Sequence, residues 1–434
     1  MTLLIKNGLV IDPSQDINGK MDIVVKGKKI MDLYPNGQGP ECDKTIDAAE
    51  CIVIPGLVDI HTHLREPGFE YKETIQTGTM AAVRGGFTSV CCMPNTSPVN
   101  DSVAVTELIL ERSKHGSCDV FPIGAITIGS ESESLTELEA LIKAGCVAFS
   151  DDGMPVTNSL LMRRALEYSK IFNVPVIAHC EDMELSKGGA MNEGFVSTIL
   201  GLPGIPKAAE ETMVARDLSL CELTGGRLHI AHVSTEGSVN LIRDAKKRGI
   251  NVTAETCPHY FSLTDEALIS YNTNLKVNPP IRTEADKEAI KEGIKDGTID
   301  AIATDHAPHH FDDKNKEFDN AAFGISGLET AFALSYQLVE IGLIDLIQLV
   351  KLMSLTPSNI MGFLKGTLKA DSDADIAIIN LNKTYKVDSL NFLSKGKNSP
   401  FNKWTLKATV EKTIARGKVH DWTENKKDED KIKS

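Results

Sequence analysis

Two histidines one residue apart, His61 and His63, are the residues whose types and spacing point most directly to chemistry. They follow an apolar run, Cys51–Val58, and precede Arg65 and Glu66. Residues i and i+2 of a strand point to the same side, so both imidazoles can reach one metal ion. Imidazole suits borderline metals such as zinc. Two histidines on a surface strand are the alternative, but the position after an apolar run favours a metal site.

The elements that must position this pair form a repeated pattern. Between about residues 55 and 364, short β-branched runs alternate with amphipathic helical stretches, which is typical of βα units on a parallel sheet. The expected strands are Val58–His63, Thr88–Met93, Val120–Ile126, Cys146–Ser150, Val174–His179, Leu228–Val233, Asn251–Cys257 and Ile299–Thr304. The expected helices include Ser102–His115, Leu135–Ala144, Ser159–Phe172, Lys207–Leu223, Glu236–Arg248, Glu284–Asp296 and Gly327–Ile341. This α/β pattern of eight strands predicts a closed (β/α)8 TIM-type barrel, whose active site lies at the C-terminal ends of the strands.

The two flanks of the chain have a different pattern. Leu3–Val25 and Asp371–Val419 contain short alternating strands separated by turns, and neither flank could bury a core alone. We therefore expect residues 1–54 and 365–420 to form one small β-sandwich domain built from both chain ends. Residues 55–364 would form the barrel. The run of mixed charges at 421–434 is expected to be a frayed tail.

Composition limits the class of protein and the kind of partner. The chain has 434 residues and a formal net charge of −14, with no stripe rich in Lys and Arg, so nucleic acid and anionic membranes are poor partners. An odd number of cysteines, nine, without a C-x-x-C pair suits reduced thiols in the cytoplasm. We see no signal peptide and no apolar stretch of membrane-spanning length. A small-molecule substrate is expected, and the sequence leaves a homodimer open.

Further polar residues stand where other expected strands end. The fifth strand ends at His179, the sixth at His232 and the eighth at Asp305. Each histidine alone would more often be a satisfied core residue. Because the C-terminal ends of barrel strands meet at one face, four histidines and an aspartate there predict a metal centre.

With these residues in place, the chain resembles the amidohydrolase superfamily and, within it, the class I dihydroorotases of bacteria. The likeness covers nearly the whole length. It rests on motifs in this order: Asp59–Gly68 (DIHTHLREPG), Met93–Thr96 (MPNT), Ser150–Gly153 (SDDG), Ile177–Glu181 (IAHCE), Ile230–Ser234 (IAHVS), Val277–Arg282 (VNPPIR) and Thr304–His309 (TDHAPH). The pieces HLREPG, MPNT and NPPIR are the most specific to dihydroorotases.

The resemblance implies a zinc-dependent cyclic amidohydrolase that interconverts N-carbamoyl-L-aspartate and (S)-dihydroorotate plus water in de novo pyrimidine biosynthesis. Two zinc ions per subunit are expected, because zinc makes water a nucleophile near neutral pH and polarises the carbonyl. The implied ligands of the first zinc are His61, His63, Asp152 and Asp305, and those of the second are Asp152, His179 and His232. Asp305 is also the implied general acid and base.

The bridging position between the two metals is the least secure of these assignments. Relatives often have a carboxylated lysine at the end of strand four, but here Lys143 lies before the strand, at the wrong end of the barrel. Asp152 matches the relatives that have an aspartate at this position, and Asp151 is the alternative.

The resemblance also implies which residues meet the substrate. Arg65 would bind its carboxylate through a charge-assisted fork, completed by Asn95 and His309, with His63 beside them. Asn278 would bond the polar edge of the ring. A turn role for Asn95 and a solvated loop position for His309 are the alternatives.

The stretch His310–Asn320 is polar and is expected to be irregular. Long loops inside compact domains are usually functional, so we expect it to close over the substrate, with the backbone of Phe323 and Gly324 at the ring. An ordinary surface loop is the alternative.

Two other functions would require different residues in the sequence. A hydantoinase or allantoinase would share the metals but would not need a carboxylate clamp at Arg65 and Asn95. A catalytically dead barrel that serves as a scaffold would be expected to lose ligands, whereas this chain keeps four histidines and Asp305.

Overall fold

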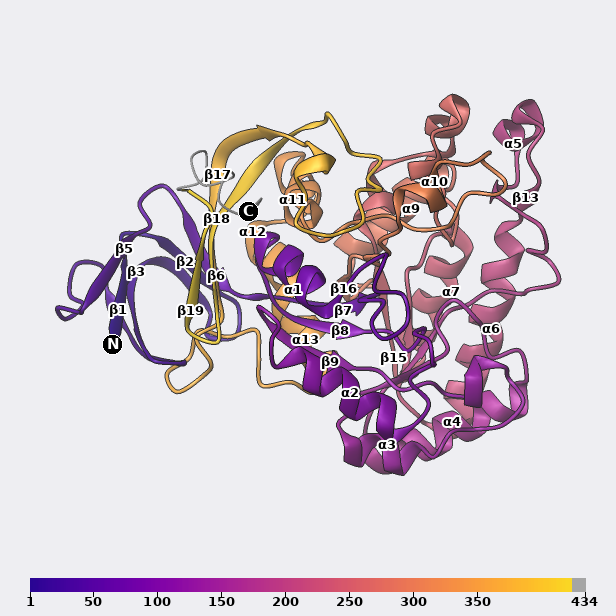
Figure 1. Cartoon of the computed structure of the whole chain (residues 1–434), viewed down its shortest axis with the longest axis horizontal. Coiled ribbons are helices and arrows are strands. Elements are labelled where there is room, and N and C mark those ends of the chain that lie inside the picture. The colour runs from indigo at the N-terminus through magenta and orange to yellow at the C-terminus, as the bar shows by residue number, and fades with distance from the viewer. Residues whose placement is uncertain (424–434) are drawn as a thin grey trace.

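The computed structural model describes residues 1–423, and residues 424–434 lie outside the described part. Figure 1 shows two parts: strands from both chain ends, in indigo and yellow, gather on one side, and the strand–helix units between them form the other. Within residues 1–423, no helix is both long and apolar enough to span a bilayer.

All eight expected barrel strands are present and pair in parallel. They are β7 (Leu57–Thr62), β8 (Phe87–Cys92), β9 (Asp119–Pro122), β10 (Phe149–Ser150), β11 (Val176–Ala178), β14 (Leu228–Ile230), β15 (Val252–Thr256) and β16 (Ala301–Ile302). A bridge between Gly124 and Phe149 joins β9 to β10, and a bridge between Thr62 and His306 brings the end of β16 back to β7. These two contacts close the barrel.

Six of these strands, β9, β10, β11, β14, β15 and β16, are shorter than the sequence predicts, and β10 and β16 are the shortest. Cys146–Ser150 and Ile299–Thr304 were expected, but β10 and β16 have two residues each. At the end of β16 the backbone N–H of Thr304 donates to the Asp59 carboxylate at 3.2 Å, and the Thr304 hydroxyl donates to the same group at 2.6 Å. A side-chain acceptor therefore replaces the next bond of the ladder, which ends the strand early.

Helices follow the strands around the barrel. They are α1 (Ile75–Arg84), α2 (Val103–Ser113), α3 (Leu138–Ala144), α4 (Ser159–Phe172), α6 (Lys207–Thr224), α7 (Glu236–Lys247), α9 (Glu284–Lys295) and α11 (Ala331–Glu340). The bounds of α4 match the prediction: the Asn158 side chain accepts from Leu160 N at 2.9 Å, and Asn173 ends the helix at a φ of 54°. Both are ordinary helix-capping devices.

Shorter elements fill the connections. They are α5 (Phe195–Leu200), α8 (Pro258–Ser262), α10 (Phe311–Lys314), α12 (Leu346–Val350), α13 (Thr356–Met361), the strands β12 (Met191–Asn192) and β13 (Gly204–Ile205), and the turns η1 (Ile128–Ser130), η2 (Asp265–Ser270), η3 (Thr273–Leu275), η4 (Lys351–Leu355) and η5 (Ser389–Asn391).

The two chain ends meet in one nine-stranded sheet. Its strands are β1 (Thr2–Lys6), β2 (Leu9–Asp12), β3 (Ile17–Lys26), β4 (Lys29–Pro35), β5 (Lys44–Asp47), β6 (Ile52–Pro55), β17 (Ile376–Lys386), β18 (Thr405–Ala415) and β19 (Lys418–Asp421). The ends join where β17 pairs antiparallel with β6. Buried side chains from both ends, among them Ile5, Ile23, Ile376 and Ile414, share one apolar cluster. The predicted fold class, a barrel with a small β-sandwich domain, is confirmed.

The exact domain bounds stay a prediction, but two of their details differ from the structure. β6 ends at Pro55, one residue beyond the expected first segment. Asp421, expected to begin the frayed tail, is the last residue of β19 and pairs with Lys412. The rest of the predicted tail lies largely outside the described residues.

One buried cation ties the barrel to the sheet. The Lys365 Nζ atom donates to Asp119 of β9 at 2.6 Å and to Asp373 and Asp375, which precede β17, at 2.8 and 2.7 Å. The Lys365 side chain is 9% exposed. It therefore links three carboxylates from both parts of the molecule, with Lys29 and Arg416 as further cations at Asp373 and Asp119.

We expect Lys365→Met to destabilise the fold, because it leaves three aspartates without their shared cation. Removing one partner of a buried ion pair costs about 3–5 kcal/mol; Asp119 and Asp373 are partly exposed, so the free energy of unfolding should fall by about 2 kcal/mol. Urea denaturation measures this change. Lys143→Met is the matched control, since Lys143 pairs with Glu139 on an exposed helix face. Equal losses in the two variants would contradict the prediction.

Candidate metal centre and substrate pocket

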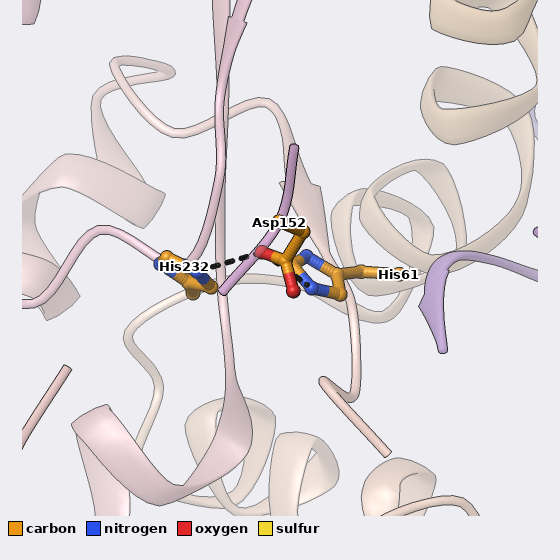
Figure 2. Close-up of side chains that lie close together, drawn as sticks. All are labelled: His61, Asp152 and His232. Atoms are coloured by element: carbon orange, nitrogen blue, oxygen red, sulfur yellow. Dashed lines mark hydrogen bonds and ion pairs between the residues drawn. The ribbon is translucent and has the colours of Figure 1, made fainter. Parts of the chain in front are cut away.

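A buried carboxylate surrounded by imidazoles lies at the C-terminal end of the barrel. Asp152 Oδ1 is 3.3 Å from His61 Nε2, 3.3 Å from His232 Nε2 and 3.5 Å from His179 Nδ1, and its Oδ2 is 3.4 Å from His63 Nε2. Figure 2 shows His61 and His232 approaching Asp152 from opposite sides. All five side chains are buried.

Asp305 completes this cluster from the end of β16. Its Oδ1 lies 3.1 Å from His63 Nε2 and 3.6 Å from His61 Nε2. Asp305 and His232 both have left-handed backbone, with φ of 46° and 34°. Such backbone is uncommon in residues other than glycine and is frequent at functional sites. The structure thus brings together residues that follow or end five strands: β7, β10, β11, β14 and β16.

The two neighbouring aspartates after β10 point in different directions. Asp151 turns away from the histidines: it accepts the backbone N–H groups of Ile126 at 2.7 Å and Thr127 at 3.1 Å, and the Thr127 hydroxyl. Burial raises the pKa of Asp151 to about 6, against the lowering effect of these hydrogen bonds. Asp152, and not Asp151, lies among the imidazoles.

Buried carboxylates that the sequence reasoning missed orient the histidines. Glu255 of β15 lies 2.6 Å from His61 Nδ1, and its other oxygen lies 3.2 Å from His229 Nε2. Glu181 lies 2.9 Å from His179 Nε2. A ring that donates to a carboxylate through one nitrogen presents a lone pair on the other, an arrangement common among metal-binding histidines. The available signal for Glu255 is an acidic residue inside an expected barrel strand.

The electrostatics of this cluster fit a bound cation. Burial by itself would lower the pKa of His61, but Asp152 and Glu255 outweigh it and raise that pKa well above its ordinary value. Burial would also raise the pKa of Glu255, yet His61 and His229 lower it to about 2. His61 Nε2 has no hydrogen-bond partner within residues 1–423. The surrounding carboxylates thus favour a positive charge at this position, and a bound metal ion would supply one.

The geometry and types of the donors also suit a metal. His61, Asp152 and His232 can bring their ligand atoms within 4.8 Å of one another, and so can His61, His63 and Asp305. Imidazole nitrogen with carboxylate oxygen is a common donor set for zinc. The residues present therefore fit the predicted metal centre, while each residue's role as a ligand stays a prediction.

A cavity of about 220 Å³ opens beside the cluster. It is lined by His63, Arg65, Asn95, Asp152, Gly153, His179, His232, Val277, Asn278, Asp305, Ala307, His309, Phe323 and Gly324. Every predicted substrate-binding residue lies on this wall, and so does every predicted metal ligand except His61. His61 is fully buried behind the cavity.

Arg65 supplies the positive charge of the cavity. Its Nε lies 3.4 Å from the carbonyl of Pro308, and burial lowers its pKa to about 10, so it stays charged at neutral pH. The neighbouring His309 lies 2.7 Å from the Phe323 carbonyl through Nε2. Burial, then Arg65, lowers the pKa of His309 to about 2, so this imidazole is neutral. A charged guanidinium beside an uncharged imidazole leaves this part of the cavity positive, which suits an anionic ligand.

The two predicted asparagines also orient other members of the site. Asn95 Oδ1 lies 2.8 Å from His63 Nδ1, so it fixes the ring that faces Asp152 and Asp305. Asn278 donates to Glu181 Oε2 at 2.8 Å, the carboxylate oxygen that also meets His179. Both amides therefore act on histidines of the centre while lining the cavity.

The segment expected to be irregular, His310–Asn320, contains the short helix α10. The Lys314 ammonium at its end is buried and donates to three carbonyls, those of Ala322 at 2.7 Å, Gly324 at 3.1 Å and Lys276 at 3.2 Å. A polar composition predicts no regular structure, but α10 forms here, and hydrogen bonds from Lys314 to distant carbonyls hold the segment in place.

Comparison with known proteins supports the resemblance drawn from the sequence motifs. A family described as Dihydro-orotase-like matches residues 50–238. A dihydroorotase of Syntrophus aciditrophicus (strain SB) is 56% identical over 423 residues, covering 96% of this chain and 99% of that protein. A dihydroorotase of Acetivibrio thermocellus is 55% identical over 419 residues, covering 96% and 98%.

Solved structures share the whole architecture. An L-hydantoinase (dihydropyrimidinase) from Arthrobacter aurescens matches with a TM-score of 0.87 and 26% identity, covering 96% of this chain and 95% of that one. A D-hydantoinase (dihydropyrimidinase) from Thermus sp. matches with a TM-score of 0.81 and 25% identity, covering 96% and 94%. The resemblance drawn from the motifs is thus confirmed at the level of the family. Given relatives more than half identical over nearly the whole length, the chain belongs to the dihydroorotase family of cyclic amidohydrolases.

Proposed function

We propose that this chain is a class I dihydroorotase of the bacterial type, which interconverts N-carbamoyl-L-aspartate and (S)-dihydroorotate plus water in pyrimidine synthesis. One observation carries this proposal: the half-buried cation Arg65 lines the same cavity as the histidine and aspartate cluster. A cyclic amide that bears a carboxylate uses both features. A carboxylate-free ring would leave the charge of Arg65 without a partner inside the cavity, where a partly desolvated charge is costly.

Two zinc ions per subunit are the proposed cofactors. His61, His63, Asp152 and Asp305 would hold the first, and Asp152, His179 and His232 the second, with Asp152 shared. Zinc, when bound, makes water acidic enough to be ionised near neutral pH and polarises a carbonyl. The support comes from His61 Nε2 and His179 Nδ1, which face Asp152 while Glu255 and Glu181 hold the other nitrogen of each ring.

Asp305 is the proposed proton carrier. Burial would raise its pKa, but its hydrogen bond to His63 and the charges of His61 and His63 lower it, so the group is ionised at neutral pH. In hydrolysis, the oxygen of water bonds to the ring amide carbon, the ring C–N bond breaks, and the carboxylate moves the proton of the water to the leaving nitrogen. Ring closure is the reverse. Such help is typically worth about 10²–10⁴-fold.

Arg65, Asn95, Asn278 and His309 are the proposed substrate contacts, with the backbone of Phe323 and Gly324 against the ring. Arg65 would pair with the carboxylate through parallel N–H groups, which fixes both position and orientation. Holding the amide carbon close to the attacking oxygen lowers the entropic part of the activation free energy.

The compartment and assembly are also proposals. All nine cysteines are free, and all but Cys42 are buried. Free thiols support a cytoplasmic location, because disulfides are rare in the cytoplasm. A homodimer stays a prediction.

The metal assignment can be tested by comparing Asp152→Ala with Asp151→Ala. Because only Asp152 lies among the imidazoles, we expect its loss to weaken zinc binding by at least about tenfold. Loss of a residue that merely orients a ligand typically weakens metal binding by about 10- to 100-fold, and loss of a ligand should weaken it at least as much. Asp151→Ala should keep zinc but lower stability by about 1–3 kcal/mol, since it leaves the N–H groups of Ile126 and Thr127 unpaired. Zinc per chain, measured after dialysis alongside dihydroorotate hydrolysis, checks this. Equal or reversed zinc losses would show that the wrong carboxylate was assigned.

The substrate assignment can be tested with Arg65→Ala. Removing a charge-assisted contact to the carboxylate should lower kcat/KM for dihydroorotate by roughly 10- to 100-fold. Turnover of dihydrouracil, the same ring without the carboxylate, should change little. Arg163→Ala is the control, because Arg163 pairs with Glu167 on an exposed face of α4. Dihydroorotate turnover that stays intact, with a loss confined to the carboxylate-free ring, would reject the proposed substrate.

A further inference from the structure

The connection between β17 and β18 reaches from the sheet to the cavity. We name residues 387–404 the strap. Figure 1 shows this gold segment leaving β17 and crossing to the barrel side of the molecule. Its Ser394 hydroxyl donates to buried Glu73, which lies 3.4 Å from His306, the residue after Asp305. The strap is thus attached to the barrel beside the end of β16.

Asn398 of the strap makes the closest connection to the cavity wall. Its Nδ2 donates to the carbonyls of Ala307 at 3.1 Å and Gly324 at 3.0 Å. Its Oδ1 accepts from the His309 backbone N–H and the Ser326 hydroxyl, both at 2.9 Å. The residue is 3% exposed, and both donors and both acceptor positions of the amide are used. One side chain therefore joins the segment after β16 to the segment after α10.

Lys314 holds the same wall from the other side. Its ammonium donates to the Ala322, Gly324 and Lys276 carbonyls, so its three hydrogen-bond partners among the described residues are all uncharged. A buried ammonium without a carboxylate is costly unless its donors are used. Burial, then Lys276, lowers the pKa of Lys314 to about 7. The three protons of the ammonium form all have carbonyl partners, so this side chain holds three backbone segments together.

The two side chains converge on one peptide. The Gly324 carbonyl accepts from both Asn398 and Lys314. Gly324 has a φ of 146°, and a Cβ at this position would lie 2.5 Å from the Ala307 carbonyl. The preceding carbonyl, of Phe323, meets His309, which stands beside Arg65. The position of His309 and of the backbone at 323–324 therefore depends on Asn398 and Lys314.

We propose that Asn398 and Lys314 are positioning residues for the substrate carboxylate: together they set the wall of His309, Phe323 and Gly324 against which Arg65 holds the ring. This inference rests on the proposed function. Neither side chain lines the cavity or reaches the metal cluster. Their effect should therefore fall on substrate binding, while zinc content is preserved.

The test compares Asn398→Ala, Lys314→Met and the double variant in the full chain. Loss of either hydrogen-bonding group should raise KM for dihydroorotate by roughly tenfold, with kcat changed less than about threefold. Zinc per chain should be unchanged. Because both side chains act through Gly324, the fold increase in KM of the double variant should be smaller than the product of the two single fold increases. Lys314→Arg keeps a cationic hydrogen-bond donor, so its KM should rise much less than that of Lys314→Met.

Matched controls make the outcomes distinct. Asn391→Ala removes an amide of the same strap whose Nδ2 donates to Asp388 on the exposed surface, and its KM should equal that of the parent. If Asn398→Ala fails to fold, Asn398→Asp decides, because it keeps the size and the acceptors but loses both donors; its KM must rise. An unchanged KM, a loss of zinc with the activity, or a double variant equal to the product would overturn the inference. Absence of dihydroorotate turnover in the zinc-loaded parent would instead overturn the proposed function, and the inference with it.

Discussion

A carboxylate buried among four imidazoles is the constraint on which the rest of this site depends. Removing a charge from water is costly unless other groups compensate it. Asp152 has ring nitrogens at 3.3–3.5 Å for this purpose. Each ring can stabilise the charge of Asp152 only if it is held in one orientation. A hydrogen bond to the other ring nitrogen fixes that orientation. Glu255, Glu181 and Asn95 do so for His61, His179 and His63. The centre therefore extends into residues that would touch no metal.

The short barrel strands are part of the same arrangement. A parallel ladder would use the backbone groups at the strand ends, and the chain could not then turn to direct side chains inward. Here Asp59 takes the N–H of Thr304, and Asp151 takes those of Ile126 and Thr127. Aspartates thus replace the last ladder bonds, and the residues that follow them are free to adopt unusual backbone. Asp305, with its φ of 46°, is the result at β16.

Much of the fold and part of the site could be predicted from the sequence. Strand periodicity fixes the side on which His61 and His63 project, and barrel geometry then places His179, His232 and Asp305 at the same end. Resemblance added Asp152 and Arg65. Lys314 and Asn398 escaped prediction because their partners, most of them backbone groups, are brought close only by tertiary folding. Asn398 is 89 residues from the His309 N–H that it accepts, and no local pattern marks such a pair.

The joining of both chain ends in one sheet has a consequence for the order in which the molecule is made. During synthesis, β1 to β6 emerge first, and the edge of β6 that later pairs with β17 has no strand to meet until the whole barrel has followed. An open strand edge can pair with other chains. The whole barrel must therefore be synthesised before that edge is covered. The strands that follow the barrel shield the earlier ones and also bring the strap to the cavity, so a chain interrupted inside the barrel has neither a closed sheet nor a finished pocket.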